Sequence, residues 1–255
     1  MSLLEIDRLS VSFGGVVALD DVSFSVDTAE LVGVIGPNGA GKTTLIEAVS
    51  GFLPESSGEV KFADHRLANL PPHRRAHLGL VRTFQAIELF DDLTVRENLA
   101  VAAHRRTWAG SLLDIVAPSR DRYRPVVDEV IDLLDLADVA DLLPPELSQG
   151  KRQLVGIARA LATGPRLVML DEPAAGLDSD ESLELGRRLR SVVESGTAVL
   201  LVDHDMGLVL GSCDRVVVLD FGRVLVSGTP QEIRANEDVI AAYLGDEALE
   251  HRDEL

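Results

Sequence analysis

Residues 31–44 of this 255-residue chain read Leu31-Val32-Gly33-Val34-Ile35-Gly36-Pro37-Asn38-Gly39-Ala40-Gly41-Lys42-Thr43-Thr44. An apolar run leads into glycine-rich residues and ends on a lysine and two threonines, which is the P-loop pattern. Glycines let successive backbone N–H groups surround a phosphate, and a helix N-terminus adds partial positive charge. In such a loop Lys42 bridges β- and γ-phosphate oxygens, and the Thr43 hydroxyl binds Mg²⁺. We therefore predict that residues 36–44 bind a nucleotide.

The residues on either side of this loop argue against the alternative, a glycine-rich turn that binds nothing. Residues 31–35 form a continuous apolar run of strand length, which is typical of a strand buried on both faces. After Lys42, the apolar residues Leu45, Ile46 and Val49 predict the inward face of a helix. A strand, a glycine-rich loop and a helix are the context that the motif requires.

The same buried-strand pattern returns three times, at residues 167–170, 198–202 and 216–219. Helical patterns separate these runs, including one over residues 183–193. Buried strands that alternate with helices predict an α/β fold with a mainly parallel sheet.

Two segments depart from this alternation. Near the N-terminus, apolar residues alternate with polar ones, which predicts half-buried antiparallel strands; these residues are Leu4, Ile6, Val11, Phe13, Val22, Phe24 and Val26. Between residues 86 and 147 the strand pattern disappears, and one amphipathic helix is predicted by the spacing of Val127, Val130, Ile131 and Leu134. We predict a P-loop NTPase core with an N-terminal antiparallel β subdomain and an inserted α-helical subdomain.

Two acidic residues, Asp171 and Glu172, follow the apolar run at residues 167–170. Acids at the carboxyl end of a parallel strand lie at the edge where α/β sheets bind ligands. Asp171 is placed to hold Mg²⁺ through its water shell, and Glu172 to polarise the water that attacks a γ-phosphate. A solvated turn is the alternative, and the presence of a P-loop favours the site.

The composition limits the class of partner. With 24 basic and 42 acidic residues the formal charge is −18, which argues against nucleic acid because a nucleic-acid binder needs a basic face. Cys213 is the single cysteine, so no intrachain disulfide forms, and we expect a buried, inert thiol rather than a reactive one. The first residues lack a signal-peptide pattern and no apolar run reaches membrane-spanning length, so we expect a cytoplasmic protein.

The stretch Leu147-Ser148-Gln149-Gly150-Lys151 resembles the signature (Leu-Ser-Gly-Gly-Gln) of the nucleotide-binding subunits of ABC transporters. It also opens a helix whose apolar face carries Leu154, Ile157, Ala158 and Leu161. Alone, Ser148 is typical of a helix N-cap. The resemblance implies that Ser148, Gln149 and Gly150 close over the γ-phosphate bound by the opposite subunit. Gln149 and Lys151 depart from the signature, but Ser148 and Gly150 are kept, so we expect binding in trans to be retained.

The resemblance runs along nearly the whole chain and implies a role for four further residues. Phe13 matches the aromatic residue that stacks on adenine, with a buried strand phenylalanine as the alternative. Gln85 matches the glutamine that senses Mg²⁺ and the attacking water, and Asp178 matches the loop that communicates across the dimer. His204 matches the switch histidine at the γ-phosphate. The implied catalytic set is Glu172, His204, Gln85 and Lys42, and the implied Mg²⁺ ligands, partly through water, are Thr43, Gln85 and Asp171.

The resemblance also implies an assembly. One P-loop and one signature make half of an ABC motor. We therefore predict that the chain forms a head-to-tail dimer with a second copy of itself or with a paralogue, and that this dimer encloses two ATP molecules. The whole chain would be one ABC ATPase domain, with residues 1–85 and 160–255 as the core and 86–159 as the helical signature subdomain. Transmembrane permease subunits, and indirectly a solute-binding protein, are the expected partners. The protein would be peripheral on the inner face of the cell membrane.

Several segments are similar to the branched-chain amino-acid importer subfamily, and these are residues 71–75, 79–85, 89–98, 172–177, 204–206 and 239–245. They contact nucleotide or the coupling surface, so the cargo assignment is an analogy. Related motors that move urea, short amides or lipopolysaccharide stay open as alternatives. So does a soluble ABC ATPase without a membrane partner, whereas a P-loop kinase or GTPase would lack the signature.

Two further groups of residues carry weaker alternatives. His73 and His77 are four residues apart, a helical spacing that suits a metal, but no third ligand accompanies them. A basic group is formed by His104, Arg105, Arg106, Arg120, Arg122 and Arg124, with Trp108 among them. We expect these residues to form a solvated helical face, and docking on acidic loops of a membrane subunit is the alternative.

Overall fold

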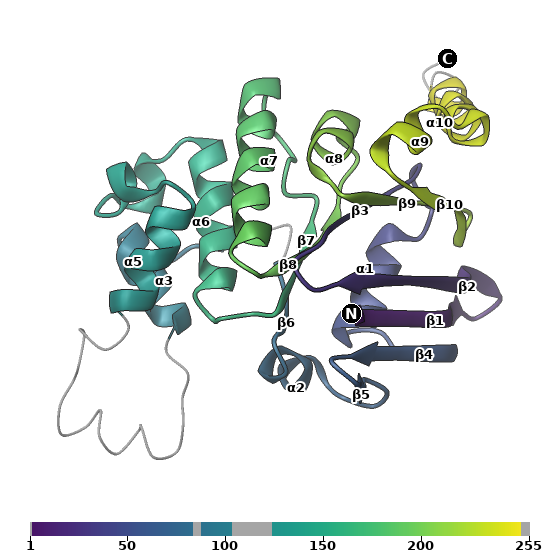
Figure 1. Cartoon of the computed structure of the whole chain (residues 1–255), viewed down its shortest axis with the longest axis horizontal. Coiled ribbons are helices and arrows are strands. Elements are labelled where there is room, and N and C mark those ends of the chain that lie inside the picture. Colours follow the sequence, from purple (N-terminus) through teal and green to yellow (C-terminus); the bar gives the residue numbers. More distant parts are fainter. Residues whose placement is uncertain (1, 84–87, 104–123, 251–255) are drawn as a thin grey trace. The chain divides into compact units, whose positions relative to one another are not determined.

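The computed structural model describes residues 2–83, 88–103 and 124–250, and for residues 244–250 it describes the backbone alone (Figure 1). The chain forms two compact units, each with its own internal packing. The first, which we call the core unit, consists of Met1–Arg82 and Arg166–Leu255. The second, the helical unit, is Thr83–Pro165.

The main sheet of the core unit has the strand order β10-β9-β3-β8-β7-β6. Its strands from β9 to β6 are parallel, and β10 is antiparallel to β9. Every residue of β3, β7 and β8 is buried, which confirms the strands predicted from continuous apolar runs. The bounds are Leu31–Ile35 for β3, Leu80–Arg82 for β6, Leu167–Asp171 for β7, Ala198–Val202 for β8, Arg215–Asp220 for β9 and Arg223–Gly228 for β10.

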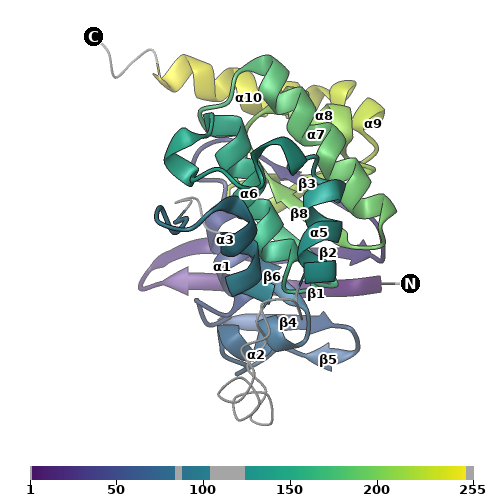
Figure 2. The same ribbon diagram turned by 90° about the vertical axis from the view of Figure 1, so that its left-hand side faces the viewer.

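A second sheet of the core unit is antiparallel, with the order β2-β1-β4-β5, and Figure 2 shows it from a second side. Its strands are β1 (Ser2–Phe13), β2 (Val16–Asp27), β4 (Ser57–Phe62) and β5 (His65–Arg66). The register pairs Ile6 with Phe24 and Leu4 with Val26, so the residues predicted from the alternating pattern face one another across the strands. Leu4, Ile6 and Val26 are buried, which confirms the predicted antiparallel subdomain.

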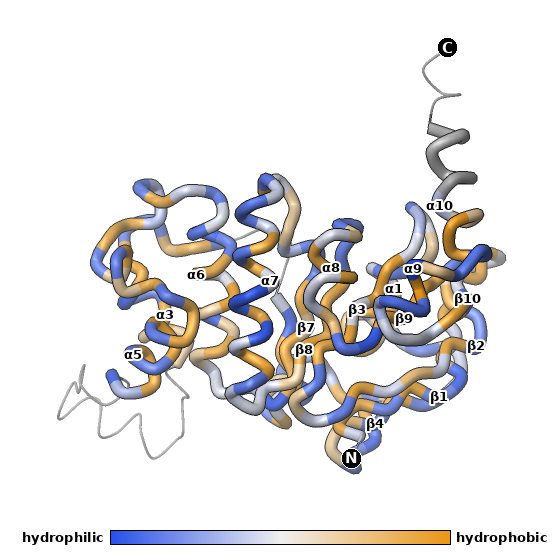
Figure 3. The backbone as a smooth tube through the Cα atoms, turned by 45° about the horizontal axis from the view of Figure 1, so that its top comes forward, coloured by the Kyte–Doolittle hydropathy of each residue, from blue (hydrophilic) through white to orange (hydrophobic). Residues whose placement is uncertain are grey.

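The two sheets differ in hydropathy as their exposure requires. In Figure 3 the β1 and β2 strands alternate between hydrophobic and hydrophilic colours, whereas β7 and β8 are mostly hydrophobic. A strand covered on both faces needs apolar side chains on both, while a half-buried strand needs them only on alternate residues. The sequence pattern therefore separates the two sheets before any contact is known.

Helices cover both faces of the main sheet. Helix α1 contacts β6 and β7, whereas α7 and α8 contact β8 and β3 from the other side (Figure 1). The predicted inward residues of α1, Leu45, Ile46 and Val49, are fully buried. The helices of the core unit are α1 (Lys42–Ser50), α2 (Pro72–His77), α7 (Ser179–Glu194), α8 (Met206–Ser212), α9 (Pro230–Arg234) and α10 (Glu237–Glu250).

Helix α7 begins four residues before the predicted pattern over residues 183–193. Its N-cap is Asp178, whose side chain accepts bonds from the backbone of Asp180 and Glu181. Glu181 in turn reaches the Asp178 backbone, and the pair forms a capping box. Leu183 is exposed, because the buried face of this helix passes through Ser182, Leu185 and Leu189 instead. The apolar pattern therefore placed the start of α7 too late, because a capping box and not apolar spacing marks this start.

The helical unit contains α3 (Val95–Ala103), α5 (Arg124–Leu133) and α6 (Gln149–Leu161), with short 3-10 turns at Ala137–Val139 and Pro144–Glu146. Helix α3 contacts both α5 and α6, and Figures 1 and 2 show the three grouped together. The predicted amphipathic face is buried at Val127, Val130, Ile131 and Leu134, which confirms that helix. Among the described helices of the chain, none is long and apolar enough to span a bilayer.

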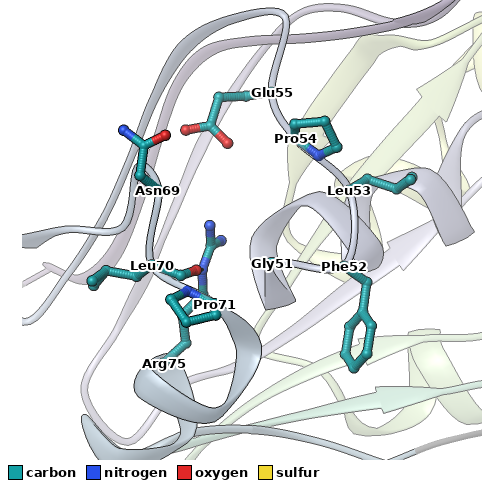
Figure 4. Close-up of a pocket in the computed structure, with 9 residues that line it drawn as sticks. All are labelled: Gly51, Phe52, Leu53, Pro54, Glu55, Asn69, Leu70, Pro71 and Arg75. Atoms are coloured by element: carbon teal, nitrogen blue, oxygen red, sulfur yellow. The ribbon is translucent and has the colours of Figure 1, made fainter.

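A buried arginine fastens the end of α1 inside the core unit. Arg75 on α2 donates from Nη1 to the carbonyl oxygens of Ala48 and Val49, and from Nε to that of Leu70, each at 2.8 Å. Figure 4 shows its guanidinium between Gly51, where α1 ends, and the segment before α2, beside a pocket of about 300 Å³. Burial lowers the pKa of Arg75. The guanidinium thus satisfies carbonyls at a helix C-terminus, where intrahelical donors are missing.

Replacing this arginine should destabilise the core unit. Arg75→Met leaves three carbonyl groups without a charged donor, and hydrogen bonds to charged groups contribute about 1.5–3 kcal/mol each. Because such contributions are not additive, we expect urea denaturation to show a loss of about 2–3 kcal/mol in the free energy of unfolding. Arg74→Met is the matched control, since Arg74 is exposed on the same helix and should change stability by less than about 0.5 kcal/mol. Equal losses in the two variants would contradict this role of Arg75.

Candidate nucleotide site

Strand register brings the predicted site residues of the core unit to one edge of the main sheet. Val34 of β3 pairs with Val202 of β8, and Val202 pairs with Asp171 of β7. These three residues form one row across parallel strands, so the loops that follow them leave the sheet side by side. The P-loop follows β3, the acidic pair ends β7, and His204 follows β8. The row is the geometric reason that segments distant in sequence share one site.

The P-loop backbone packs against neighbouring strands at two glycines. Gly36 has φ 155°, and a Cβ atom there would lie 2.1 Å from the carbonyl oxygen of Leu219 at the end of β9. Gly41 has φ 101°, and its Cβ would lie 2.7 Å from the carbonyl oxygen of Ala18. A side chain fits neither position, so glycine is needed for the loop to reach its place. The N–H of Gly222, in the β9–β10 turn, holds the loop from outside by donating to the Ala40 carbonyl at 3.1 Å.

Lys42 supplies a cation within this loop. Its residue is 7% exposed, and Nζ donates to the carbonyl oxygens of Gly36 at 2.5 Å and Pro37 at 3.0 Å. Thr43 and Thr44 follow in the first turn of α1, which carries no acidic residue. A helix N-terminus without acidic side chains next to a buried ammonium group favours a bound anion such as a phosphate. Pro37, Asn38, Gly39 and Ala40 form the rest of the loop, as predicted from the sequence.

Asp171 is the buried acid of the site. It is 3% exposed, and its Oδ2 accepts a bond from Nη2 of Arg82 at 2.9 Å. Its Oδ1 is also buried and has no hydrogen-bond partner among the described residues. Burial raises the pKa of Asp171, and the hydrogen bond and positive charge of Arg82 oppose that rise. A buried carboxylate oxygen without a protein donor suits a metal-bound water, so Asp171 fits the predicted Mg²⁺ site.

Glu172 sits in a strained backbone conformation. Its φ is 49°, in the left-handed region that non-glycine residues seldom adopt. Its N–H donates to the carbonyl oxygen of Val202 at 2.7 Å, which ties the end of β7 to β8. Backbone strain of this kind is concentrated at functional sites. Eight other described non-glycine residues also have a positive φ, so the strain agrees with a functional role of Glu172 but does not by itself identify the catalytic base.

The loop after β8 is organised by Asp203, which the sequence analysis did not select. Asp203 is fully buried, and its carboxylate accepts the N–H of Ala174 and the N–H of Asp205, both at 2.9 Å. It therefore ties the loop that carries His204 to the segment that follows Glu172. Burial raises the pKa of Asp203. The side chain of His204 is 63% exposed, with Nδ1 3.6 Å from Asp203 Oδ1, so it is available to a ligand.

The remaining predicted residues of the core unit lie at its surface or outside the described part. Phe13 ends β1 and is 49% exposed, so the alternative of a buried strand phenylalanine is wrong. Asp178 is exposed and caps α7. Gln85 lies outside the described residues. No role was predicted for Arg82 or Asp203. Arg82 lies within the segment 79–85 that resembles the importer subfamily, and Asp203 directly precedes His204.

The signature residues belong to the helical unit. Ser148 caps α6, and its Oγ accepts the N–H of Lys151 at 3.3 Å. Ser148 and Gln149 are exposed and Gly150 is half-buried. Lys151, whose contacts the sequence left open, donates from Nζ to the carbonyl of Asp135 at 3.0 Å and to Asp138 Oδ1 at 3.1 Å. Its ammonium group therefore fastens α6 to the turn after α5.

The weaker candidates gain little from the structure. Nδ1 of His77 lies 2.5 Å from the carbonyl oxygen of His73, so the helix backbone engages one ring nitrogen. Among the described residues no group of three or more His, Cys, Asp or Glu is arranged to hold a metal ion. Cys213 is buried, and burial raises its pKa, which disfavours the reactive thiolate. Of the basic group, Arg124 is 3.7 Å from Asp128, and the other members lie outside the described residues.

The sequence of this chain matches two families and is similar to several known proteins. The family described as "ABC transporter" matches residues 19–175, and the family described as "Branched-chain amino acid ATP-binding cassette transporter" matches residues 223–248. The chain is 38% identical to the high-affinity branched-chain amino acid transport ATP-binding protein LivG of Salmonella typhimurium, over 96% of this chain and 98% of LivG. It is 34% identical to the lipopolysaccharide export system ATP-binding protein LptB of Haemophilus influenzae, over 97% of this chain and 99% of LptB.

A solved structure shares the fold. The crystal structure of an ATP-binding cassette of an ABC transporter in its ADP conformation superposes with a TM-score of 0.83. The two chains are 30% identical, over 96% of this chain and 99% of that one. The predicted fold class, with its P-loop core, antiparallel sheet and helical segment, is therefore confirmed.

The strain at Glu172 leads to a prediction about stability. Glu172→Gly and Glu172→Ala both remove the carboxylate, but only glycine adopts φ 49° without steric cost. A left-handed alanine costs roughly 1–2 kcal/mol, and the greater entropy of glycine in the unfolded chain returns about 0.5–1 kcal/mol. We expect urea denaturation to show the glycine variant more stable than the alanine variant by about 0.5–1 kcal/mol. An alanine variant as stable as the glycine variant would show that the backbone there is unstrained.

Proposed function

This chain is an ATPase that belongs to the ABC transporter family, and from that premise we propose that it drives a membrane importer of branched-chain amino acids. The observation that supports this cargo is the match of residues 223–248 to the branched-chain amino acid transporter family. That segment runs from β10 to α10 and contains none of the nucleotide motifs. The match therefore carries information about the subfamily beyond ATP chemistry. The name of LivG points to the same cargo.

The second candidate is the same motor with another cargo. The similarity to LptB, whose name refers to lipopolysaccharide export, covers nearly all of both chains. Nucleotide motifs are shared by motors with different cargo, so this similarity leaves the ATPase assignment unchanged. The identity to LptB is lower than to LivG, and we therefore favour the amino-acid importer.

In the proposed site the P-loop holds the nucleotide phosphates. Backbone N–H groups of residues 38–44 and the Lys42 ammonium bind the β- and γ-phosphate oxygens, and the exposed ring of Phe13 stacks on adenine. Thr43 and Asp171, with Gln85 from its motif, would hold Mg²⁺, partly through water. When bound, Mg²⁺ neutralises charge on the phosphate oxygens. The buried Oδ1 of Asp171 supports this assignment.

The residues that we assign to hydrolysis follow β7 and β8. We assign Glu172 the role of polarising the attacking water, and His204 that of contacting the γ-phosphate. The Asp203 carboxylate supports both, because it bonds the N–H groups of Ala174 and Asp205 on either side of the site. Removal of a proton by a positioned carboxylate contributes roughly 10²–10⁴-fold to rate.

The complete site needs a second cassette, which is this chain again or a paralogue. A head-to-tail arrangement would bring Ser148 and Gly150 of one copy to the nucleotide on the P-loop of the other. Ser148 accepts one bond from Lys151 and keeps its hydroxyl proton to donate to a phosphate oxygen. Gln149 is exposed beside it, and Asp178 would report the state of one site to the other. Each site would therefore have residues from both cassettes.

The motor also needs partners that carry the cargo. We propose that it binds transmembrane permease subunits on the inner face of the cell membrane and acts, through them, with a solute-binding protein. ATP binding would close the dimer and hydrolysis would reopen it, because ATP adds contacts that only the closed state makes.

A variant of the proposed base should separate ATP binding from hydrolysis. We expect Glu172→Gln to bind ATP with Mg²⁺ but to lower the ATPase rate at least about 100-fold, because the general base is lost. Light scattering should then show twice the monomer mass, since the ATP-bound dimer cannot reopen. Lys42→Ala is the control, and it should stay monomeric because it binds ATP poorly. A monomer mass for Glu172→Gln would contradict an ATP-enclosing dimer of this chain with itself and leave the paralogue as the second cassette. Near-normal turnover would remove Glu172 from the base role.

Cargo is tested by uptake in the source cells. Replacing the wild-type protein with Glu172→Gln should abolish uptake of labelled leucine, isoleucine and valine while unrelated solutes still enter normally. The measurement is the initial uptake rate over the first minute, compared with cells that carry wild type. Unchanged uptake of all three amino acids would overturn the cargo assignment and leave the ATPase in place.

A further inference from the structure

A mostly buried arginine forms an ion pair with the acid that we assign to the metal. Arg82 is the last residue of β6, and Nη2 of its guanidinium is 2.9 Å from Oδ2 of Asp171. The side chains of Arg82 and Asp171 are 9% and 2% exposed, so the ion pair is shielded from water. The parallel register pairs Arg82 with Met169, two residues before Asp171, so the arginine reaches the acid from the neighbouring strand.

Other contacts hold this arginine in place. Its Nη1 lies 3.5 Å from Oγ of Ser50, at the end of α1. Its Cζ lies 5.7 Å from the centre of the Phe52 ring, within the range of a cation–π contact. Strand β7, the end of α1 and the turn that follows it thus fix the guanidinium, and a fixed guanidinium fixes the carboxylate that it binds.

The two oxygens of Asp171 have different surroundings. Oδ2 accepts the bond from Arg82, whereas Oδ1 is buried and has no hydrogen-bond donor among the described residues. A carboxylate held through only one oxygen cannot rotate without breaking that bond. Oδ1 therefore keeps a single orientation, which a metal-bound water requires of its acceptor. Oriented outer partners of this kind commonly decide how well a metal site binds.

We propose that Arg82 is a positioning residue for magnesium, which holds Asp171 by Oδ2 so that Oδ1 faces the water shell of the ion. The inference rests on the proposed function, because it takes Asp171 as the metal-side carboxylate. Its content is new to that function, since the resemblance of residues 79–85 to the importer subfamily gives Arg82 no role at the metal. It also predicts that magnesium affinity and nucleotide affinity respond differently to changes at Arg82.

A purely structural ion pair is the competing explanation, and it has a different signature. A structural arginine that is lost would disturb the P-loop region in general and would weaken nucleotide binding with or without magnesium. A positioning arginine that is lost should weaken only the part of nucleotide binding that depends on the metal. The ratio of the Kd for ADP in EDTA to the Kd in Mg²⁺ measures that part.

The experiment is a titration of the full chain with fluorescently labelled ADP, once in Mg²⁺ and once in EDTA. We expect Arg82→Met to lower the Kd ratio about tenfold or more, which is the usual effect of removing an outer partner of a metal site. Its Kd in EDTA should stay within about twofold of wild type, because the P-loop holds the phosphates. Arg82→Lys, which keeps the charge and one donor, should recover part of the ratio.

Two matched controls show whether the effect passes through Asp171. Arg215→Met breaks another partly buried ion pair of the core unit, in which Nε of Arg215 is 2.9 Å from Oε1 of Glu30, and it should leave the ratio unchanged. The double variant Arg82→Met/Asp171→Asn should have the ratio of Asp171→Asn alone, since Arg82 then has no carboxylate to position.

The outcomes separate this inference from the function on which it rests. If Asp171→Asn leaves the ratio at the wild-type value, the metal role of Asp171 fails and the inference fails with it. If Asp171→Asn lowers the ratio while Arg82→Met leaves it unchanged, or if Arg82→Met weakens binding equally in EDTA, only the role of Arg82 is overturned. Arg82→Gln, which keeps an N–H donor, replaces Arg82→Met if that variant does not fold, and an unchanged ratio there has the same meaning.

Discussion

The alignment of β3, β8 and β7 in one parallel register is the constraint on which the rest of the site depends. The row Val34–Val202–Asp171 sets where each strand ends, and the functional loops begin within two residues of that row. Parallel strands need long connections, so residues far apart in sequence arrive at the same edge. A shift of one residue in β7 would move Asp171 about 3.3 Å along the sheet and turn its side chain to the other face, away from the P-loop.

The site concentrates features that a stable fold otherwise avoids. Glu172 has a left-handed backbone, Asp171 and Asp203 are buried acids, and the ammonium group of Lys42 lies within a glycine loop. The two buried acids have partners that offset their cost: Arg82 compensates the charge of Asp171, and two backbone N–H groups bind Asp203. A buried charge with a fixed partner has one orientation, and a group with one orientation can be aimed at a phosphate or a metal.

The two units supply different chemical groups to the proposed site. The core unit supplies the cation, the carboxylates and the histidine, whereas the helical unit supplies an exposed helix N-terminus at Ser148. Lys151 stands where the signature has glutamine, and its contacts with Asp135 and Asp138 turn it toward its own unit. The exposed end of α6 then consists of Ser148 and Gln149, with no charged group from Lys151 in front of it. That arrangement suits the proposed contact with a second cassette.

The sequence alone determined the elements whose signals are local. Continuous apolar runs predicted β3, β7 and β8, alternation predicted β1 and β2, and the glycine spacing predicted the P-loop, because each pattern reflects burial or backbone geometry within a few residues. The start of α7 escaped, since its mark is the Asp178 capping box and not apolar spacing. Tertiary structure alone decided which charged groups meet. Arg82 and Asp171 are 89 residues apart, Ala174 and Asp203 are 29 apart, and Arg75 lies 27 residues from Ala48. The periodic spacing of a helix or strand does not relate residues so far apart in sequence. Only the packing of strands and helices determines which buried donor faces which acceptor.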